Sequence, residues 1–146
     1  MPTAAKLTAA ILFALMTIVA SEQFKAYMPE GYQFGYFLWI NAAIAAPIAW
    51  KLIGGRVGNG VASAINNGVT ALLALVVVLL FNHSFRLMIL ESTGIGYANL
   101  TAALQDVASK MIEHGLLLLN TDILVTFGIG TFVTAILAEA ASRRWR

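Results

Sequence analysis

Long stretches without a charged residue dominate this chain. A helix that crosses the apolar core of a bilayer, about 30 Å thick, needs about 20 mostly apolar residues. Two charge-free windows reach that length alone, 31–50 and 57–85. Two others, 7–21 and 123–138, reach it when flanking polar residues lie among the lipid headgroups. The pattern therefore predicts four transmembrane helices, over about 4–24, 34–54, 60–83 and 116–139.

The first of these segments has a second interpretation. Lys6, the apolar run 7–20 and Ser21 follow the layout of a secretory signal peptide. Against cleavage, Ile18 and Val19 stand where the small residues of a cleavage site are needed, and a single lysine precedes the run. We therefore expect the first helix to be retained.

The segment between the third and fourth predicted helices has a different pattern. Its apolar residues recur at the i, i+3 and i+4 spacing of one helix face, at Leu100, Ala103, Leu104, Val107, Ala108, Met111 and Ile112. This spacing predicts an amphipathic helix over about 99–113, with Asn99 as its N-cap. Two placements remain open, because such a helix either lies along the outer membrane surface or packs against the bundle.

Composition places the chain among small integral membrane proteins. Of its 146 residues, 60% are hydrophobic and 11% are charged, against about 25% charged in ordinary soluble domains. This balance excludes intrinsic disorder and disfavours a soluble enzyme of this size. We expect an all-α membrane protein with a single domain, 1–146. It is a four-transmembrane-helix bundle in the lipid bilayer, with an additional amphipathic helix between the third and fourth spans.

Lysines and arginines are divided unequally between the two sides of such a bundle. Three fall on the side of the long loop, and six fall on the side of both termini. Those six are Lys6, Lys51, Arg56, Arg143, Arg144 and Arg146. The positive-inside rule then puts both termini in the cytoplasm. We expect a multi-pass protein of a bacterial inner membrane.

Small residues recur at every fourth position on two of the predicted spans. On the fourth span they are Thr126, Gly130, Thr134 and Ala138, and on the second they are Ala42 with Ala46 and Ala45 with Ala49. Small side chains let helix backbones approach closely where lipid supplies no hydrophobic driving force. These faces predict close helix contacts, either within the bundle or between the copies of a homo-oligomer.

Uncharged polar residues inside the predicted spans are the candidate binding residues. Asn41 lies in the second span, Asn66 and Asn67 lie in the third, and Arg56 lies in the glycine-rich turn between them. They either hydrogen-bond neighbouring helices or line a path for a polar substrate. For an oxyanion, the amides would donate hydrogen bonds and Arg56 would supply the nearby positive charge.

Signals for other chemistry are weak. His83 and His114 fall near the outer ends of their segments, where Glu113 or Asp122 could complete a metal site, but no ligand spacing supports one. We expect exposed interfacial histidines and no metal. The chain has no cysteine, no phosphate-binding loop and no nucleophile with a base at a useful spacing. We therefore expect no enzyme activity, no catalytic residue, no cofactor and no nucleic-acid partner.

Several short pieces of the chain carry a resemblance to a known family. They are 1–7 (MPTAAKL), 28–31 (MPEG) followed by Phe34-Gly35, 41–44 (NAAI), Trp50 and 143–146 (RRWR). In order and spacing they are similar to the bacterial tellurite-resistance protein TrgA family, over essentially the whole length. The chain departs from that pattern at 45–47, where it has Ala-Ala-Pro instead of the expected glycine.

The resemblance implies an inner-membrane protein associated with tellurite resistance, and it brings no catalytic residues. Two functions remain open. The protein acts on the transport or exclusion of the oxyanion, or it is a membrane scaffold or assembly partner without its own substrate. The proton-coupled mechanism of small four-helix drug exporters is disfavoured, because those proteins resemble this chain in size but carry a glutamate in the first span, and 7–21 has none.

Overall fold

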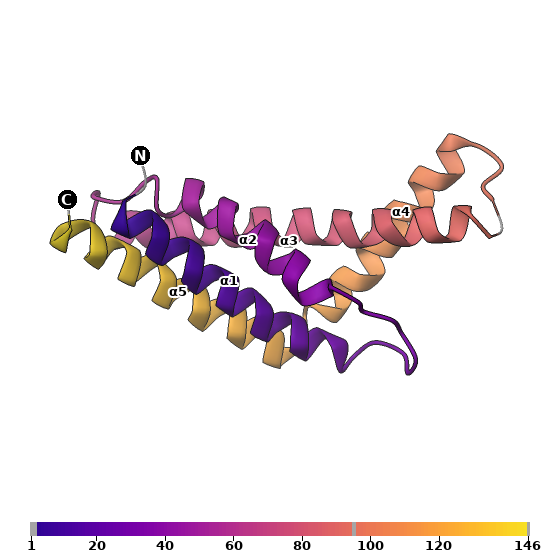
Figure 1. The fold of residues 1–146 in the computed structure, drawn as a ribbon, viewed down its shortest axis with the longest axis horizontal. Helices are drawn as coiled ribbons and strands as arrows, with labels where there is room; N and C mark the ends of the chain where they lie inside the picture. The colour runs from indigo at the N-terminus through magenta and orange to yellow at the C-terminus, as the bar shows by residue number, and fades with distance from the viewer. Residues whose placement is uncertain (1–2, 95, 146) are drawn as a thin grey trace.

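All regular structure in the described part of the chain is helical. The computed structural model describes residues 3–94 and 96–145. It contains α1 (Ala4–Lys25), α2 (Phe37–Leu52), α3 (Val61–Ser92), α4 (Leu100–Leu117) and α5 (Thr121–Arg144), which are labelled in Figure 1. The predicted all-α fold is therefore confirmed. Three of the described helices, α1, α3 and α5, are long and apolar enough to cross a membrane.

The prediction of four full-length spanning helices is wrong in its count, because α2 has only 16 residues. The sequence predicted a span over 34–54. The helix begins late because Gly35 has a φ of +51°, a left-handed conformation that interrupts a right-handed helix. It ends at a tight turn in which Gly54 lies against α1. A Cβ atom on Gly54 would stand 2.5 Å from Cα of Lys6.

The end of the third predicted helix and the start of the last one also differ from the prediction. The third helix was predicted to end at 83, but it continues to Ser92 through Arg86 and Glu91. The last helix starts at Thr121 instead of 116, because the preceding leucines belong to the end of α4 and to a turn. In that turn the side-chain amide of Asn120 donates to the carbonyl of Leu117, 2.7 Å away.

Helix α4 forms where the amphipathic pattern predicted it. The side-chain oxygen of Asn99 accepts a hydrogen bond from the backbone N–H of Ala102 at 2.8 Å, so Asn99 is the N-cap. Of the predicted apolar residues, Ala103 and Val107 are buried. The helix therefore packs against the bundle, the second of the two placements. It still exposes an apolar row with one residue every fourth position: Leu100, Leu104, Ala108, Ile112 and Leu116.

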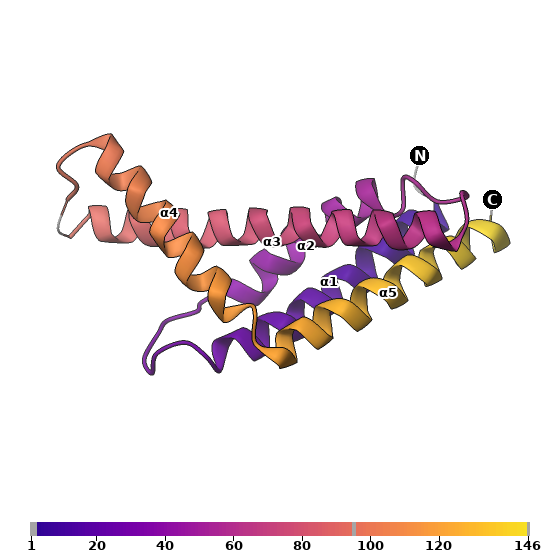
Figure 2. The same cartoon turned by 180° about the vertical axis from the view of Figure 1, so that it is seen from behind.

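Four helices form a ring in the order α1, α2, α3, α5, because α1 packs against α2 and α5, and α3 packs against the same two. Helix α4 packs on α3 outside this ring. Figure 1 shows the start of α1 and the end of α5 at the same end of the bundle, which we call the terminal end. At the opposite end α3 extends beyond the ring. Figure 2 shows α4 running back across this extension and leading into α5.

The small residues of α5 pack against other helices of the same chain. A Cβ atom on Gly130 would stand 2.3 Å from Cγ of Met16 in α1, and Thr134 and Ala138 are buried. Ala45 and Ala49 of α2 are fully buried as well. These faces therefore make helix contacts within one copy. A homo-oligomer stays a prediction and would need other faces.

A buried carboxylate at the terminal end binds the turn between α2 and α3. Glu139 of α5 is 2% exposed, and its carboxylate accepts from the backbone N–H groups of Gly58 at 2.8 Å and Gly60 at 3.1 Å. Arg143 donates to the same group at 3.4 Å. Both glycines have φ values above +90°, a conformation that side chains rarely adopt. The glycine-rich turn between α2 and α3 is thus tied to α5.

Candidate functional site

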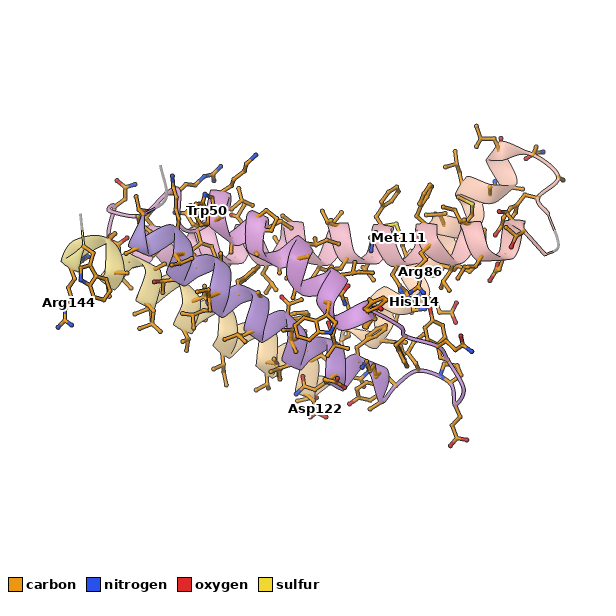
Figure 3. All side chains as sticks on the ribbon, viewed as in Figure 1. Trp50, Arg86, Met111, His114, Asp122 and Arg144 are labelled. Atoms are coloured by element: carbon orange, nitrogen blue, oxygen red, sulfur yellow. The ribbon has the colours of Figure 1, made fainter. Side chains whose placement is uncertain are left out.

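A buried cavity lies at the end of the ring opposite the terminal end. Its polar wall residues come from α1 (Thr17 and Ser21), α2 (Asn41), α3 (His83) and α4 (His114), and apolar side chains close the remainder. We call this cavity the histidine chamber. Its volume is about 40 Å³, enough for about three water molecules. In Figure 3, His114 and Arg86 both lie toward the end of the molecule opposite Trp50 and Arg144.

The two histidines of the chamber face each other. Their ring centroids are 4.9 Å apart with the ring planes at 81°, and each residue is 7% exposed. The prediction of exposed interfacial histidines is therefore wrong. The reason is the fold of α4, which turns back along α3 and carries His114 against His83. The two residues are 31 positions apart in the chain, and no helical period connects them.

The protonation of His114 follows from its hydrogen bond. Its Nδ1 atom lies 2.7 Å from the backbone carbonyl of Lys110. A carbonyl oxygen can only accept, so Nδ1 carries the hydrogen and donates it. In the neutral ring the other nitrogen, Nε2, then has a free lone pair. The backbone of α4 thus fixes the tautomer of the side chain that it places in the chamber.

A tyrosine from the loop between α1 and α2 partners the other histidine. The Tyr32 hydroxyl lies 3.2 Å from Nε2 of His83. Burial raises the pKa of this tyrosine, and the charge of Arg86 partly opposes the increase, so the hydroxyl stays protonated near neutral pH. Aromatic rings surround the pair, with Phe37 5.4 Å and Phe24 6.3 Å from the His83 ring centroid.

Asn41 is the one predicted binding residue that lies in the chamber. It is 5% exposed, and its side-chain amide donates to Oγ of Ser21 at 2.9 Å. This bond connects α2 to α1 at the wall of the cavity. Thr17 has an internal partner, since its hydroxyl donates to the carbonyl of Phe13 at 2.7 Å.

The structure places the other three predicted residues elsewhere. Asn67 donates to the backbone carbonyl of Arg56 at 3.2 Å, and the side chains of Asn66 and Arg56 are exposed. These residues lie near the start of α3, about 24 Å along the helix axis from His83. The four predicted residues therefore do not form one site. The amides were grouped by their chemistry, and the sequence could not reveal that they lie near opposite ends of the bundle.

Charged side chains are scarce around the chamber. No aspartate or glutamate is among the described residues that line the cavity. Arg86 is close enough for its charge to act on Tyr32, and its Nη2 atom would lie 4.0 Å from a Cβ atom on Gly35. Within 3–94 and 96–145, no group of three or more histidine, cysteine or carboxylate side chains is arranged to hold a metal ion.

An ionic cluster beside the chamber holds α4 on the extension of α3. The Lys110 ammonium lies 2.5 Å from Oε2 of Glu91 and also pairs with Asp106. Tyr97 donates to the same Asp106 carboxylate at 2.6 Å. That bond raises the pKa of Tyr97 to about 12, and the pairing with Lys110 lowers the pKa of Asp106. Lys110 also supplies the carbonyl that orients His114, so the cluster and the chamber share a residue.

The structure thus defines a helical protein with membrane-length apolar helices and a small, mostly apolar cavity that two histidines line. Comparisons of the chain with protein-family models, with curated proteins and with solved structures gave no match.

Proposed function

We propose that this chain is a multi-pass protein of the bacterial inner membrane that acts in tellurite resistance by binding the oxyanion in the histidine chamber. The observation that carries the proposed site is a cavity with two facing histidines, Asn41 and no carboxylate in its described lining, with the charge of Arg86 close enough to act on Tyr32. Buried anions need charge-assisted hydrogen bonds. His83 and Asn41 in the lining, and Tyr32 beside His83, carry suitable donors, and Arg86 outside the lining provides a partial counter-charge. The link to tellurite rests on the resemblance to the TrgA family.

We also propose that α2 makes a fourth crossing, which leaves both termini in the cytoplasm. Its 16 residues rise about 24 Å, and the loop segments on either side supply the remainder of an apolar core of about 30 Å. The start of α1 and the end of α5 share one end of the bundle. Five lysines and arginines of the described residues belong to that end, Lys6, Lys51, Arg56, Arg143 and Arg144, as the positive-inside rule requires of a cytoplasmic face. The histidine chamber then lies in the outer half of the bundle.

A second candidate function is a membrane scaffold or assembly partner without a substrate. The observation that favours it is the mutual pairing of the chamber's polar groups, Asn41 with Ser21 and Tyr32 with His83. A cavity of about 40 Å³ with satisfied walls also occurs as a purely structural feature. Under this function, resistance depends only on how much folded protein is present.

Growth of a tellurite-sensitive bacterial host distinguishes the two functions. The host expresses the wild type, His83→Phe or His114→Phe, substitutions that keep a ring in the chamber, or the control Asn66→Ala on the exposed face of α3. Under the binding function, the two chamber variants grow at tellurite concentrations at least severalfold lower than the wild type and the control, at equal membrane abundance. Equal growth of all four at equal abundance contradicts oxyanion binding in the chamber and leaves the scaffold.

Cellular tellurium, measured on the same cultures, tells transport from exclusion. If the protein excludes or exports the oxyanion, the chamber variants accumulate more tellurium than the control. If it guides the oxyanion to a detoxifying partner, accumulation stays equal while growth still falls.

A further inference from the structure

The histidine chamber contains a proton acceptor that anion binding alone does not use. Nδ1 of His114 donates to the carbonyl of Lys110 at 2.7 Å, so Nε2 is the basic nitrogen of this neutral ring. The residue is buried, and its ring centroid lies 6.2 Å from that of Phe24 and 4.9 Å from that of His83. The lone pair of Nε2 is thus enclosed in a mostly apolar space at the wall of the cavity.

The surroundings of His114 hold few other groups that could take up a proton. Helix α3 contributes His83 and Arg86, the loop before α2 contributes Tyr32, and α4 contributes the backbone of Lys110, whose ammonium is paired with Glu91 and Asp106. The described lining residues from α1, α2 and α5 do not titrate: Thr17, Ala20, Ser21, Phe24, Phe37, Asn41 and Phe127. Arginine stays protonated, and the tyrosine hydroxyl is already neutral. The two histidines are therefore the available acceptors.

An anion that enters this chamber lacks a full counter-charge. Arg86 is only half buried and is absent from the described lining of the cavity. Burying an unpaired charge in apolar surroundings is far less favourable than burying an ion pair. Protonation of one imidazole would supply the missing charge beside the anion. With the two ring centroids 4.9 Å apart, a second proton would meet like-charge repulsion. One proton for each monovalent anion is the arrangement that these distances favour.

We propose that the chamber takes up one proton with each monovalent oxyanion and that Nε2 of His114 is the acceptor. An N–H bond forms at Nε2 as hydronium or a protonated buffer molecule in the adjacent water phase releases a proton, so one bond from hydrogen to the donor breaks for each N–H bond formed. The imidazolium keeps its Nδ1–H bond to the Lys110 carbonyl and donates its new N–H to the anion, so no net charge is buried. This inference rests on the proposed function, because it concerns the same site and the same ligand.

Calorimetry in paired buffers tests the inference. Tellurite is titrated into the purified full-length protein at one alkaline pH, in two buffers that differ in ionisation enthalpy, and the difference in heat gives the protons taken up per ion bound. We expect about one proton for the wild type and about zero for His114→Gln, whose amide can still donate to the anion. His83→Gln keeps the acceptor, so it binds more weakly but still takes up about one proton.

The pH dependence of affinity gives a second measurement. Linkage of one proton makes the dissociation constant of the wild type rise up to tenfold per pH unit on the alkaline side, and this slope is lost in His114→Gln. Two results overturn the inference while leaving the proposed function intact. One is wild-type binding without proton uptake, and the other is equal proton uptake by the wild type and His114→Gln, which would place the proton on the ion. Absence of tellurite binding to the folded wild type contradicts the proposed function itself.

Discussion

The contact between Gly130 and Met16 allows a sharp test of how α5 packs on α1. A Cβ atom on Gly130 would lie 2.3 Å from Cγ and 2.6 Å from Sδ of Met16, so Gly130→Ala must displace that side chain or separate the helices. The same helix supplies a matched control. Around Gly128, no atom lies within 4 Å of the added Cβ, so Gly128→Ala changes the helix without creating a clash.

The two substitutions share one favourable contribution and differ in one unfavourable one. Replacing a helical glycine by alanine stabilises by up to about 1 kcal/mol. Overpacking a tight contact destabilises by about 1–3 kcal/mol, and only Gly130→Ala incurs it. The two variants should therefore differ by about 1–3 kcal/mol. For a chain of this size that corresponds to a difference in midpoint temperature of about 3–9 °C, with Gly130→Ala the lower of the two.

Thermal unfolding of the purified variants in one detergent, followed by circular dichroism, measures this difference. Met16→Ala removes the two nearest atoms, so in that background the two glycine variants should differ by less than about 1 kcal/mol. Gly130→Ala unfolding at or above the temperature of Gly128→Ala would refute the close approach of α5 to α1.

Three further predictions concern other parts of the chain. Glu139→Ala leaves two backbone N–H groups without their acceptor and should destabilise the protein by about 2–4 kcal/mol, measured by unfolding in detergent. A loss of stability below about 0.5 kcal/mol contradicts the role of Glu139 in holding the glycine-rich turn. The lowered pKa of Asp106 means that the pairing of its carboxylate with Lys110 stabilises α4 at neutral pH. This stabilisation is lost as the pH falls below 3.8, the ordinary pKa of an aspartate side chain. Hydrogen exchange in α4 should therefore accelerate, after correction for the intrinsic rate, below that pH in the wild type and already at neutral pH in Asp106→Asn. Reporters fused at Gly96 and after the C-terminus should report opposite sides of the membrane, and the same side for both contradicts the proposed topology.

Much of the helical layout could be predicted because it depends on local pattern. Charge-free windows located α1, and the i, i+3, i+4 spacing with Asn99 as the cap located α4. The length of α2 could not be predicted, because it depends on the backbone conformation at Gly35 and on the approach of Gly54 to Lys6. A hydropathy pattern contains neither the backbone conformation of Gly35 nor the contact of Gly54 with α1.

The candidate site was less accessible from the sequence. The polar residues in apolar segments included Asn41, which lines the chamber, but the two histidines of the chamber, His83 and His114, come from segments whose packing the sequence does not specify. The hairpin of α3 and α4 brings them together and also places Arg86 nearby. The half-buried Tyr32 lies in a loop, where the sequence carries no periodic signal.

Equilibrium binding of tellurite to the purified protein tests the location of the site most directly. Equilibrium dialysis with quantification of bound tellurium compares the wild type with Arg86→Gln, near Tyr32 and the histidine chamber, and with Arg56→Gln, at the terminal end. Each variant removes one positive charge. The account predicts that Arg86→Gln weakens binding at least tenfold, while Arg56→Gln binds as the wild type does. Weakened binding by Arg56→Gln with unchanged binding by Arg86→Gln would contradict the account, because it would place the oxyanion at the opposite end of the bundle.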